Sequence, residues 1–199
     1  MNISANIKMN EKAESSVKAF ASIAIGRCFS VKCLRVIDGE KGLFVSMPCS
    51  KGKDGKYYDY TYPLTAELRE QISNAVLKEY ENPKGEQAKE NTIEENLDIQ
   101  FKLSPTEKLG ANVKAVGTMT INNEFVVTGI KIVDGEKGLF VTMPSVKAKD
   151  GNYISIANPI TAEFRKKVNE GALKAYANLA TIKTQETKPQ NKPQGAKGR

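Results

Sequence analysis

The sequence predicts an α+β protein made of two tandem units, each an antiparallel β-sheet with a C-terminal amphipathic helix. Three observations predict this fold class. A shift of 96 positions aligns the two halves of the 199-residue chain without a gap, and 20 of the 32 residues in 38–69 are identical to those in 134–165. Short alternating apolar segments separated by turn residues indicate antiparallel strands. An apolar stripe with a spacing of four residues follows them in both halves, as in an amphipathic helix.

Composition sets the expected boundaries of these units. The first unit occupies 1–81 and the second 97–180, and a polar linker with one proline and one glycine joins them over 82–96. Residues 181–199 are rich in Lys, Gln, Pro and Thr, so we expect a disordered basic tail. One unit of about eighty residues buries little apolar surface alone, so we expect the two units to pack together as an intrachain pseudo-dimer.

The first elements of each unit form a predicted hairpin. Apolar residues alternate over 17–25 and again over 113–121, which indicates half-buried strands. Gly-Arg at 26–27 and Asn-Asn at 122–123 suit the positive φ angles of a two-residue turn. The pattern predicts that a second strand follows each of these turns.

The next elements are predicted here for the first unit and recur 96 residues later. The second strand spans 28–37, and Asp38-Gly39 form a turn. A third strand spans 42–47, and a fourth spans 56–62 after a loop.

Each helix begins after a proline-containing segment. Thr65 is the predicted N-cap of the first helix, because its side chain can accept a hydrogen bond from the first turn. The apolar stripe of this helix is Leu68, Ile72, Val76 and Tyr80. The stripe of the second helix is Phe164, Val168, Ala172 and Tyr176.

Composition also excludes several function classes. The chain has no histidine, which rules out Ser-His-Asp and Cys-His catalysis, and its three cysteines form no metal or redox motif. We therefore expect no cofactor, no metal and no catalytic residues. No apolar run approaches the ~20 residues of a membrane helix, and the N-terminus lacks a secretory signal, so the expected location is cytoplasmic. The net charge is +7, of which +4 lies in residues 183–199; such a basic tail suits weak, salt-sensitive binding to polyanions or serves only as a solubilising end.

A longer motif carries a family resemblance. VIDGEKGLFVSMP, then Asp-Gly, then YPLT resembles the SpoVG family, stage V sporulation protein G, and the second half repeats the pattern as IVDGEKGLFVTMP with NPIT. The resemblance implies a tandem version of a family whose members look like homodimers, regulate septation or sporulation, and in several cases bind DNA or RNA. In the family, the loop after the Met-Pro pair usually carries adjacent Lys-Arg. Here those positions read Ser50-Lys51 and Val146-Lys147, so each copy keeps one of the two charges.

These loops supply the candidate nucleic-acid-binding residues: Lys51, Lys53, Lys56, Lys147 and Lys149. Lysines on a loop can contact phosphates without reading sequence, although an ordinary solvated loop has the same composition. Two arginines in matching helical first turns, Arg69 and Arg165, are further candidates, and the sequence equally allows each to pair with a neighbouring carboxylate.

Two other motifs receive structural interpretations. Tyr58, Tyr60 and Tyr62 alternate on one strand face, which suits base stacking, but the second copy has Ile, Ile and Asn there. A buried or interface stripe is therefore predicted. The repeated DGEKG is interpreted as a tight turn and not as a catalytic acid pair.

The resulting functional hypothesis is a non-catalytic, regulatory DNA- or RNA-binding protein. The alternative is a protein-interaction scaffold in septation or sporulation control that does not itself bind nucleic acid.

Overall fold

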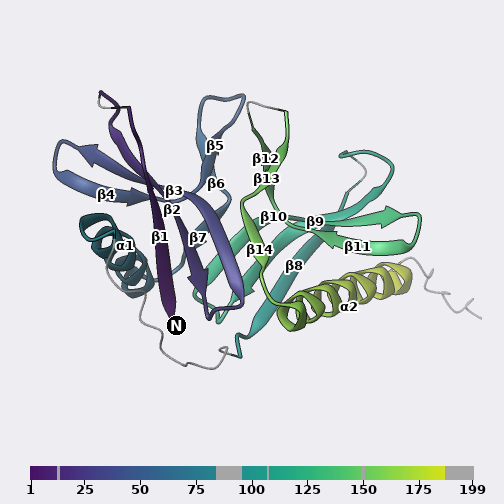
Figure 1. Ribbon diagram of the computed structural model, residues 1–199. Coiled ribbons are helices and arrows are strands. Elements are labelled where there is room, and N and C mark those ends of the chain that lie inside the picture. Colours follow the sequence, from purple (N-terminus) through teal and green to yellow (C-terminus); the bar gives the residue numbers. More distant parts are fainter. Residues whose placement is uncertain (13, 84–95, 107, 149–150, 187–199) are drawn as a thin grey trace, which may run out of the picture.

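The computed structural model describes residues 1–12, 14–83, 96–106, 108–148 and 151–186, and it contains two copies of one element order (Figure 1). The first copy comprises β1 (Ile3–Met9), β2 (Val17–Ile25), β3 (Phe29–Gly39), β4 (Gly42–Ser46), β5 (Cys49–Lys51), β6 (Tyr57–Asp59), β7 (Thr61–Pro63) and α1 (Ala66–Glu81). The second comprises β8 (Ile99–Pro105), β9 (Val113–Ile121), β10 (Phe125–Gly135), β11 (Gly138–Thr142), β12 (Ser145–Lys147), β13 (Tyr153–Ser155), β14 (Ala157–Pro159) and α2 (Ala162–Glu186).

The two units exchange their last strands. The first sheet has the order β1-β2-β3-β14, so it ends in a strand of the second unit, and β4 pairs with the far part of β3. The second sheet has the order β11-β10-β9-β8, and β7 of the first unit pairs with β10. Phe29 lies opposite Pro159, and Phe125 lies opposite Pro63. The expected intrachain pseudo-dimer is thus confirmed, and reciprocal strand pairing joins its halves.

A β-bulge makes this exchange possible. One edge of β3 pairs with β14 over residues 29–31 and with β4 over residues 35–39. The register against β2 shifts between these stretches, where Cys33 adopts a φ of 66°. The second unit repeats the bulge with Gly129 at a φ of 74°. An extra residue bends a strand, so the bulge lets one strand serve two partners in succession.

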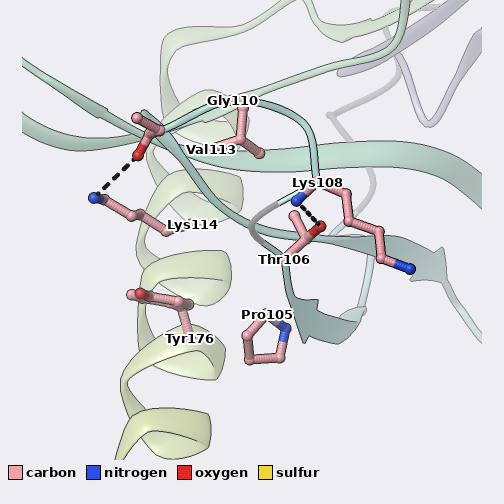
Figure 2. Close-up of a pocket in the computed structure, with 8 residues that line it drawn as sticks. Pro105, Thr106, Lys108, Gly110, Val113, Lys114 and Tyr176 are labelled. Carbon is pink, nitrogen blue, oxygen red and sulfur yellow. Dashed lines mark hydrogen bonds between the residues drawn. The ribbon is translucent and has the colours of Figure 1, made fainter.

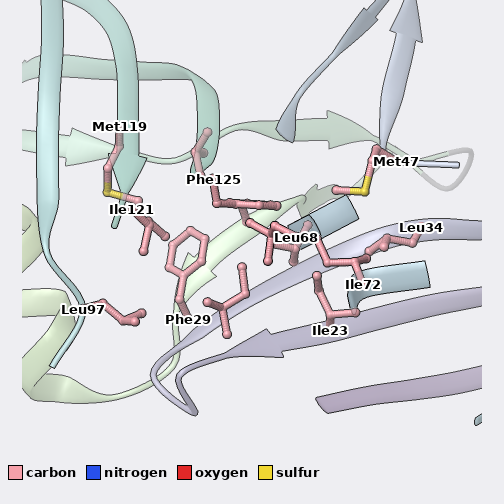
Figure 3. Close-up of a cluster of buried hydrophobic side chains, with 14 of the residues drawn as sticks. Ile23, Phe29, Leu34, Met47, Leu68, Ile72, Leu97, Met119, Ile121 and Phe125 are labelled. Carbon is pink, nitrogen blue, oxygen red and sulfur yellow. The ribbon is translucent and has the colours of Figure 1, made fainter. Parts of the chain in front are cut away.

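The hydrophobic core runs through both units. Its cluster includes Phe29, Leu68 and Phe125 (Figure 3). Phe164 belongs to the same cluster, and its ring meets that of Phe29 edge to face with centroids 6.0 Å apart. Phe29 belongs to the first unit and Phe164 to the helix of the second. Aromatic pairs of this geometry contribute beyond their buried area, so the junction is part of the core itself.

Several predicted elements are confirmed. The strands at 17–25 and 113–121 have the predicted bounds. The predicted positive φ angles are present, 54° and 59° at 26–27 and 48° and 56° at 122–123. The loops are one residue longer than predicted, because Ile25 pairs with Phe29 and Ile121 pairs with Phe125. Thr65 is the N-cap of α1, and its Oγ1 accepts a hydrogen bond from the Leu68 N–H at 3.2 Å.

Other predictions need correction. The single strand predicted over 56–62 is wrong, because the chain bends at Tyr60 and its two halves, β6 and β7, pair with different partners. The turn predicted at Asp38-Gly39 lies two residues later, at Glu40-Lys41, between the paired residues Gly39 and Gly42. The strands β1, β8, β5 and β12 are not among the predicted elements.

The sequence predicts a disordered tail from residue 181, but the helix before it is longer than predicted. Helix α2 continues to Glu186, which is possible because residues 181–186 contain neither proline nor glycine. The remaining tail, 187–199, and the central part of the predicted linker, 84–95, lie outside the described residues.

Candidate functional site

Two short hairpins hold the loop lysines. In the first, β5 pairs with β6 and Lys51 lies opposite Tyr57; in the second, β12 pairs with β13 and Lys147 lies opposite Tyr153. The N–H of Gly52 donates to the carbonyl of Lys56 at 2.7 Å, and the equivalent bond joins Ala148 to Asn152 at 2.7 Å. The two hairpins therefore share one backbone design.

Both hairpins are anchored where the units join. At the base of the first hairpin the Tyr60 carbonyl accepts the N–H of Thr128 at 2.8 Å, and Thr128 lies on β10 of the other unit. At the base of the second, the Ile156 carbonyl accepts the N–H of Lys32 on β3 at 2.7 Å. Both hairpins rise from the same side of the sheets, while α1 and α2 lie on the opposite side (Figure 1). Their separation is thus set by the exchanged strands.

The loop lysines are accessible. Lys51, Lys53, Lys56 and Lys147 are exposed, and none of these four forms an ion pair with a described residue. Lys149 lies outside the described residues. Exposed ammonium groups without carboxylate partners can bind phosphates at little desolvation cost.

The loop of the first hairpin has an internal polar contact. The Tyr58 hydroxyl donates to Asp54 Oδ2 at 2.6 Å, and the Lys56 N–H donates to Asp54 Oδ1 at 3.1 Å. The bond from Tyr58 is the main reason that the pKa of the Asp54 carboxyl falls below its usual value, and the pKa of the Tyr58 hydroxyl rises in return. Isoleucine occupies the position of Tyr58 in the second hairpin, so this contact belongs to one copy.

The three tyrosines of the predicted stripe lie in different environments. Tyr62 lies on β7 opposite Val126 of the other unit, as an interface residue, and Tyr60 is half-buried. Tyr58 is 54% exposed, so its assignment to a buried or interface stripe is wrong. The stripe fails because the bend at Tyr60 ends the alternation that a continuous strand would impose.

Sequence reasoning omitted the most exposed aromatic residues. Tyr57 and Tyr153 occupy matching positions and are 68% and 72% exposed. The repeat holds a signal for them: between 57–62 and 153–158 this tyrosine is the one identity in six positions.

The two arginines do not join the hairpins. Arg165 donates from Nη2 to the Pro159 carbonyl at 2.9 Å, which ties the start of α2 to β14. Arg69 is exposed at the start of α1. Since the helices lie across the sheets from the hairpins, these residues form no common site with the loop lysines (Figure 1).

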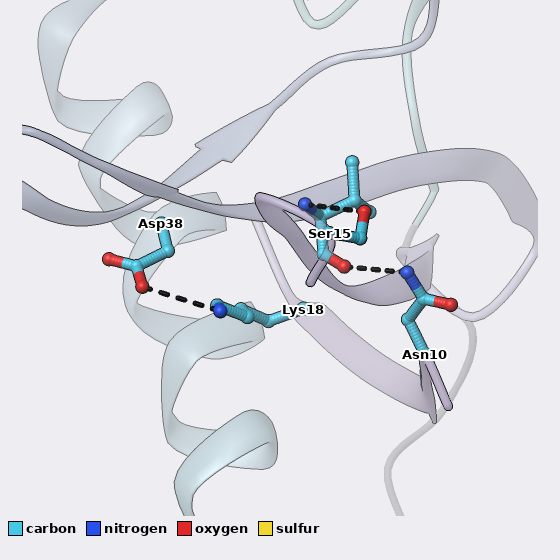
Figure 4. A network of polar contacts seen from close by, with 5 residues as sticks. Asn10, Ser15, Lys18 and Asp38 are labelled. Carbon is cyan, nitrogen blue, oxygen red and sulfur yellow. Dashed lines mark hydrogen bonds and ion pairs between the residues drawn. The ribbon is translucent and has the colours of Figure 1, made fainter. Parts of the chain in front are cut away.

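The repeated DGEKG motif has a structural partner. Asp38 pairs with Lys18 at 3.5 Å (Figure 4), and Asp134 pairs with Lys114 at 3.3 Å. Each pair bridges adjacent strands near the end of a sheet, where exposed ion pairs contribute only about 0–1 kcal/mol. Glu40 and Glu136 then lie in the tight turns, in accord with the structural interpretation of the motif.

One hollow lies away from the hairpins. It has a volume of about 720 Å³ and lies between the β8–β9 connection and α2, with Thr106, Lys108, Lys114 and Tyr176 on its walls (Figure 2). Lys114 is already held by Asp134 and by the Ala111 carbonyl at 3.3 Å. The wall residues that the structure describes include no carboxylate.

Thiol and metal chemistry find little support in the part of the chain that is described. Cys28, Cys33 and Cys49 form no disulfides, and burial raises the pKa of the Cys33 thiol, which Arg35 and Lys32 partly oppose. Among the described residues no group of three metal-ligating side chains occurs, and no helix is sufficiently long and apolar to cross a membrane.

Comparison with known proteins gives one consistent result. A family model described as SpoVG matches residues 1–82 and 95–178. The "Putative septation protein SpoVG" of Symbiobacterium thermophilum is 48% identical over 77 residues, 38% of this chain and 55% of that protein. Proteins with the same description are 46% identical over 69 residues in Archaeoglobus fulgidus and 39% identical over 88 residues in Geobacillus thermodenitrificans. These two matches cover 35% and 44% of this chain and 81% and 88% of the relatives, respectively. Each match thus has the length of one repeated unit.

Proposed function

The chain belongs to the SpoVG family, and from that premise we propose that it is a non-catalytic regulatory protein that binds DNA or RNA. The observation that carries the proposal is the pair of hairpins, β5–β6 and β12–β13, whose lysines are exposed. The names of its relatives point to septation as the regulated process. The cytoplasm is the compartment in which such a regulator acts.

The proposed mode of binding is electrostatic. Lys51, Lys53 and Lys56 on one hairpin and Lys147 and Lys149 on the other contact phosphates, while the exchanged strands hold the hairpins at a fixed separation. Such contacts position a nucleic acid without reading its sequence and release counterions when they form. Four phosphate contacts reduce the affinity about a hundredfold between 50 and 200 mM salt.

The test is a binding titration with fluorescein-labelled DNA and RNA of random sequence at both salt concentrations. The variant K51Q/K53Q/K147Q/K149Q should bind more weakly. The slope of log affinity against log salt concentration should become shallower by about one for each of these lysines that contacts a phosphate. Its matched control is K12Q/K41Q/K108Q/K137Q, which removes the same charge from repeated, exposed positions outside the hairpins. A chain lacking 187–199 separates the contribution of the tail, because α2 continues to Glu186.

Two results count against the proposal. If the chain binds neither DNA nor RNA at 50 mM salt, the proposed nucleic-acid-binding function is wrong. Equal affinities for the hairpin variant and its control remove the hairpins from the mode of binding.

A protein-interaction scaffold is the second candidate, and one observation favours it. Within the described residues β4 pairs only with β3 and β11 only with β10, so each presents a strand edge. Leu43, Phe44, Leu139 and Phe140 are exposed on these strands. Extended peptides bind to such edges by adding a strand. A stable protein partner retained without nucleic acid, and lost on substitution of Phe44 and Phe140, would favour this function.

A further inference from the structure

The tyrosines at the hairpins lack a structural role. Tyr57 and Tyr153 are the two most exposed of the large hydrophobic side chains described, and neither has a recorded ring contact or side-chain hydrogen bond there. An aromatic side chain on a surface leaves apolar area in water, so it contributes little to folding. Their retention in both copies, where five neighbouring positions differ, therefore calls for a role outside the fold.

Each tyrosine is paired with a lysine. Tyr57 lies directly opposite Lys51, and Tyr153 lies directly opposite Lys147. Residues opposite each other in an antiparallel pair share a face, with Cβ atoms about 4.5–5.5 Å apart. Each hairpin therefore offers one aromatic ring and one ammonium group on the same surface.

This pairing matches the chemistry of a nucleotide. An aromatic ring stacks on the face of a base, and an ammonium group contacts the phosphate beside it. In a duplex the base faces are covered by their neighbours, so a surface ring gains nothing from them. The ligand that satisfies both groups is a strand with unpaired bases.

We propose that Tyr57 and Tyr153 stack on unpaired bases of a single-stranded nucleic acid while Lys51 and Lys147 contact its phosphates. The inference rests on the proposed nucleic-acid-binding function and narrows its ligand to single strands. Because stacking tolerates any base, the two hairpins bind without strong sequence preference.

The experiment compares a 20-nucleotide U strand, a 20-nucleotide dT strand and a 20-base-pair DNA duplex by fluorescence anisotropy. The variant Tyr57→Leu/Tyr153→Leu should bind both single strands at least about tenfold more weakly and bind the duplex as the unaltered chain does. The control Phe44→Leu/Phe140→Leu removes two rings from repeated positions of similar kind, 48% and 46% exposed, and should leave all three affinities unchanged.

A second variant reports stacking directly. The chain contains no tryptophan, so Tyr153→Trp introduces a single tryptophan at the hairpin, whose emission can be excited separately from that of the tyrosines. Its emission should be quenched by the dT strand and not by the duplex, and this readout does not depend on the stability of the leucine variant.

The possible outcomes separate the two proposals. Unchanged single-strand affinity in the leucine variant, or equal loss for strands and duplex, overturns the stacking inference while nucleic-acid binding stands. Tryptophan emission that is insensitive to a bound single strand overturns it as well. Failure of the unaltered chain to bind any of the three probes overturns the proposed function, and the inference with it.

Discussion

The two units differ where a strand meets its helix. The second unit places Phe101 on β8 against Gly171 of α2, where an added Cβ would lie 2.9 Å from the ring. The equivalent positions of the first unit are Ala5 on β1 and Ala75 on α1. Phe and Gly together are larger than two Ala by several methylene groups, so the contact between strand and helix is packed differently in the two units.

The junction, in contrast, is nearly symmetrical. The Leu64 N–H donates to the Glu124 carbonyl at 2.6 Å, and the Ile160 N–H donates to the Cys28 carbonyl at 2.8 Å. These are equivalent bonds on the two sides of the junction. The comparison teaches that backbone pairing between the units is kept while side-chain packing within each unit drifts. Substitutions at matching positions can test this contrast.

The largest effect is expected at the junction core. Phe29→Ala should lower the free energy of unfolding by about 3–5 kcal/mol, because it leaves a cavity under both units. Phe125→Ala should cost about 1 kcal/mol less, since the position of Phe164 is occupied by Leu68 on that side and no edge-to-face pair is lost. Chemical denaturation measures both, with the exposed Phe20→Ala as control. A loss no larger for Phe29 than for Phe20 would contradict the shared core.

An intermediate effect is expected at Gly117. Its added Cβ would lie about 2 Å from the Lys102 carbonyl oxygen, so β8 must shift to admit it. Gly117→Ala should lower the free energy of unfolding by about 2 kcal/mol. The first unit has Ala21 at this position, and Ala21→Gly should cost only about 0.5–1 kcal/mol through chain entropy. Equal losses measured by thermal denaturation would show that the two sheets pack alike here.

The smallest effect is expected at the bulge and should be stabilising. Cys33 holds a φ of 66° without the freedom of glycine, whereas Gly129 supplies that freedom in the second unit. Cys33→Gly should raise the free energy of unfolding by about 0.5–1 kcal/mol, as relief of the left-handed strain exceeds the entropy cost of glycine. The reverse change, Gly129→Ala, should destabilise by about 1 kcal/mol. Denaturation midpoints under reducing conditions decide, and a destabilised Cys33→Gly chain would refute the prediction.

The sequence predicts single strands and helices better than it predicts which strands pair. The alternation over 17–25 and the cap at Thr65 are local patterns, and the structure has both. The exchange of β7 and β14 is not a local pattern. Each is three residues long, too short for a periodicity, and its pairing partner lies in the other unit. The strand β1 does carry alternating Ile3, Ala5 and Ile7, a usable signal that the predicted elements omit.

Only part of the candidate site can be predicted from the sequence. The loop lysines follow from the repeat and from the family resemblance. The exposure of Tyr57 does not, because it depends on the bend at Tyr60 that separates the hairpin from β7. Internal comparison of the two copies identifies this tyrosine, and only the register places it opposite Lys51.

The contact between Tyr58 and Asp54 makes the two hairpins chemically different. A pair of identical subunits related by a two-fold axis looks the same after half a turn. Here one hairpin carries a tyrosine bonded to its loop, and the other carries Ile154 at that place. An elongated ligand that spans both hairpins therefore meets different neighbours at its two ends. For the strand proposed above, its two orientations across the hairpins would therefore not be equivalent.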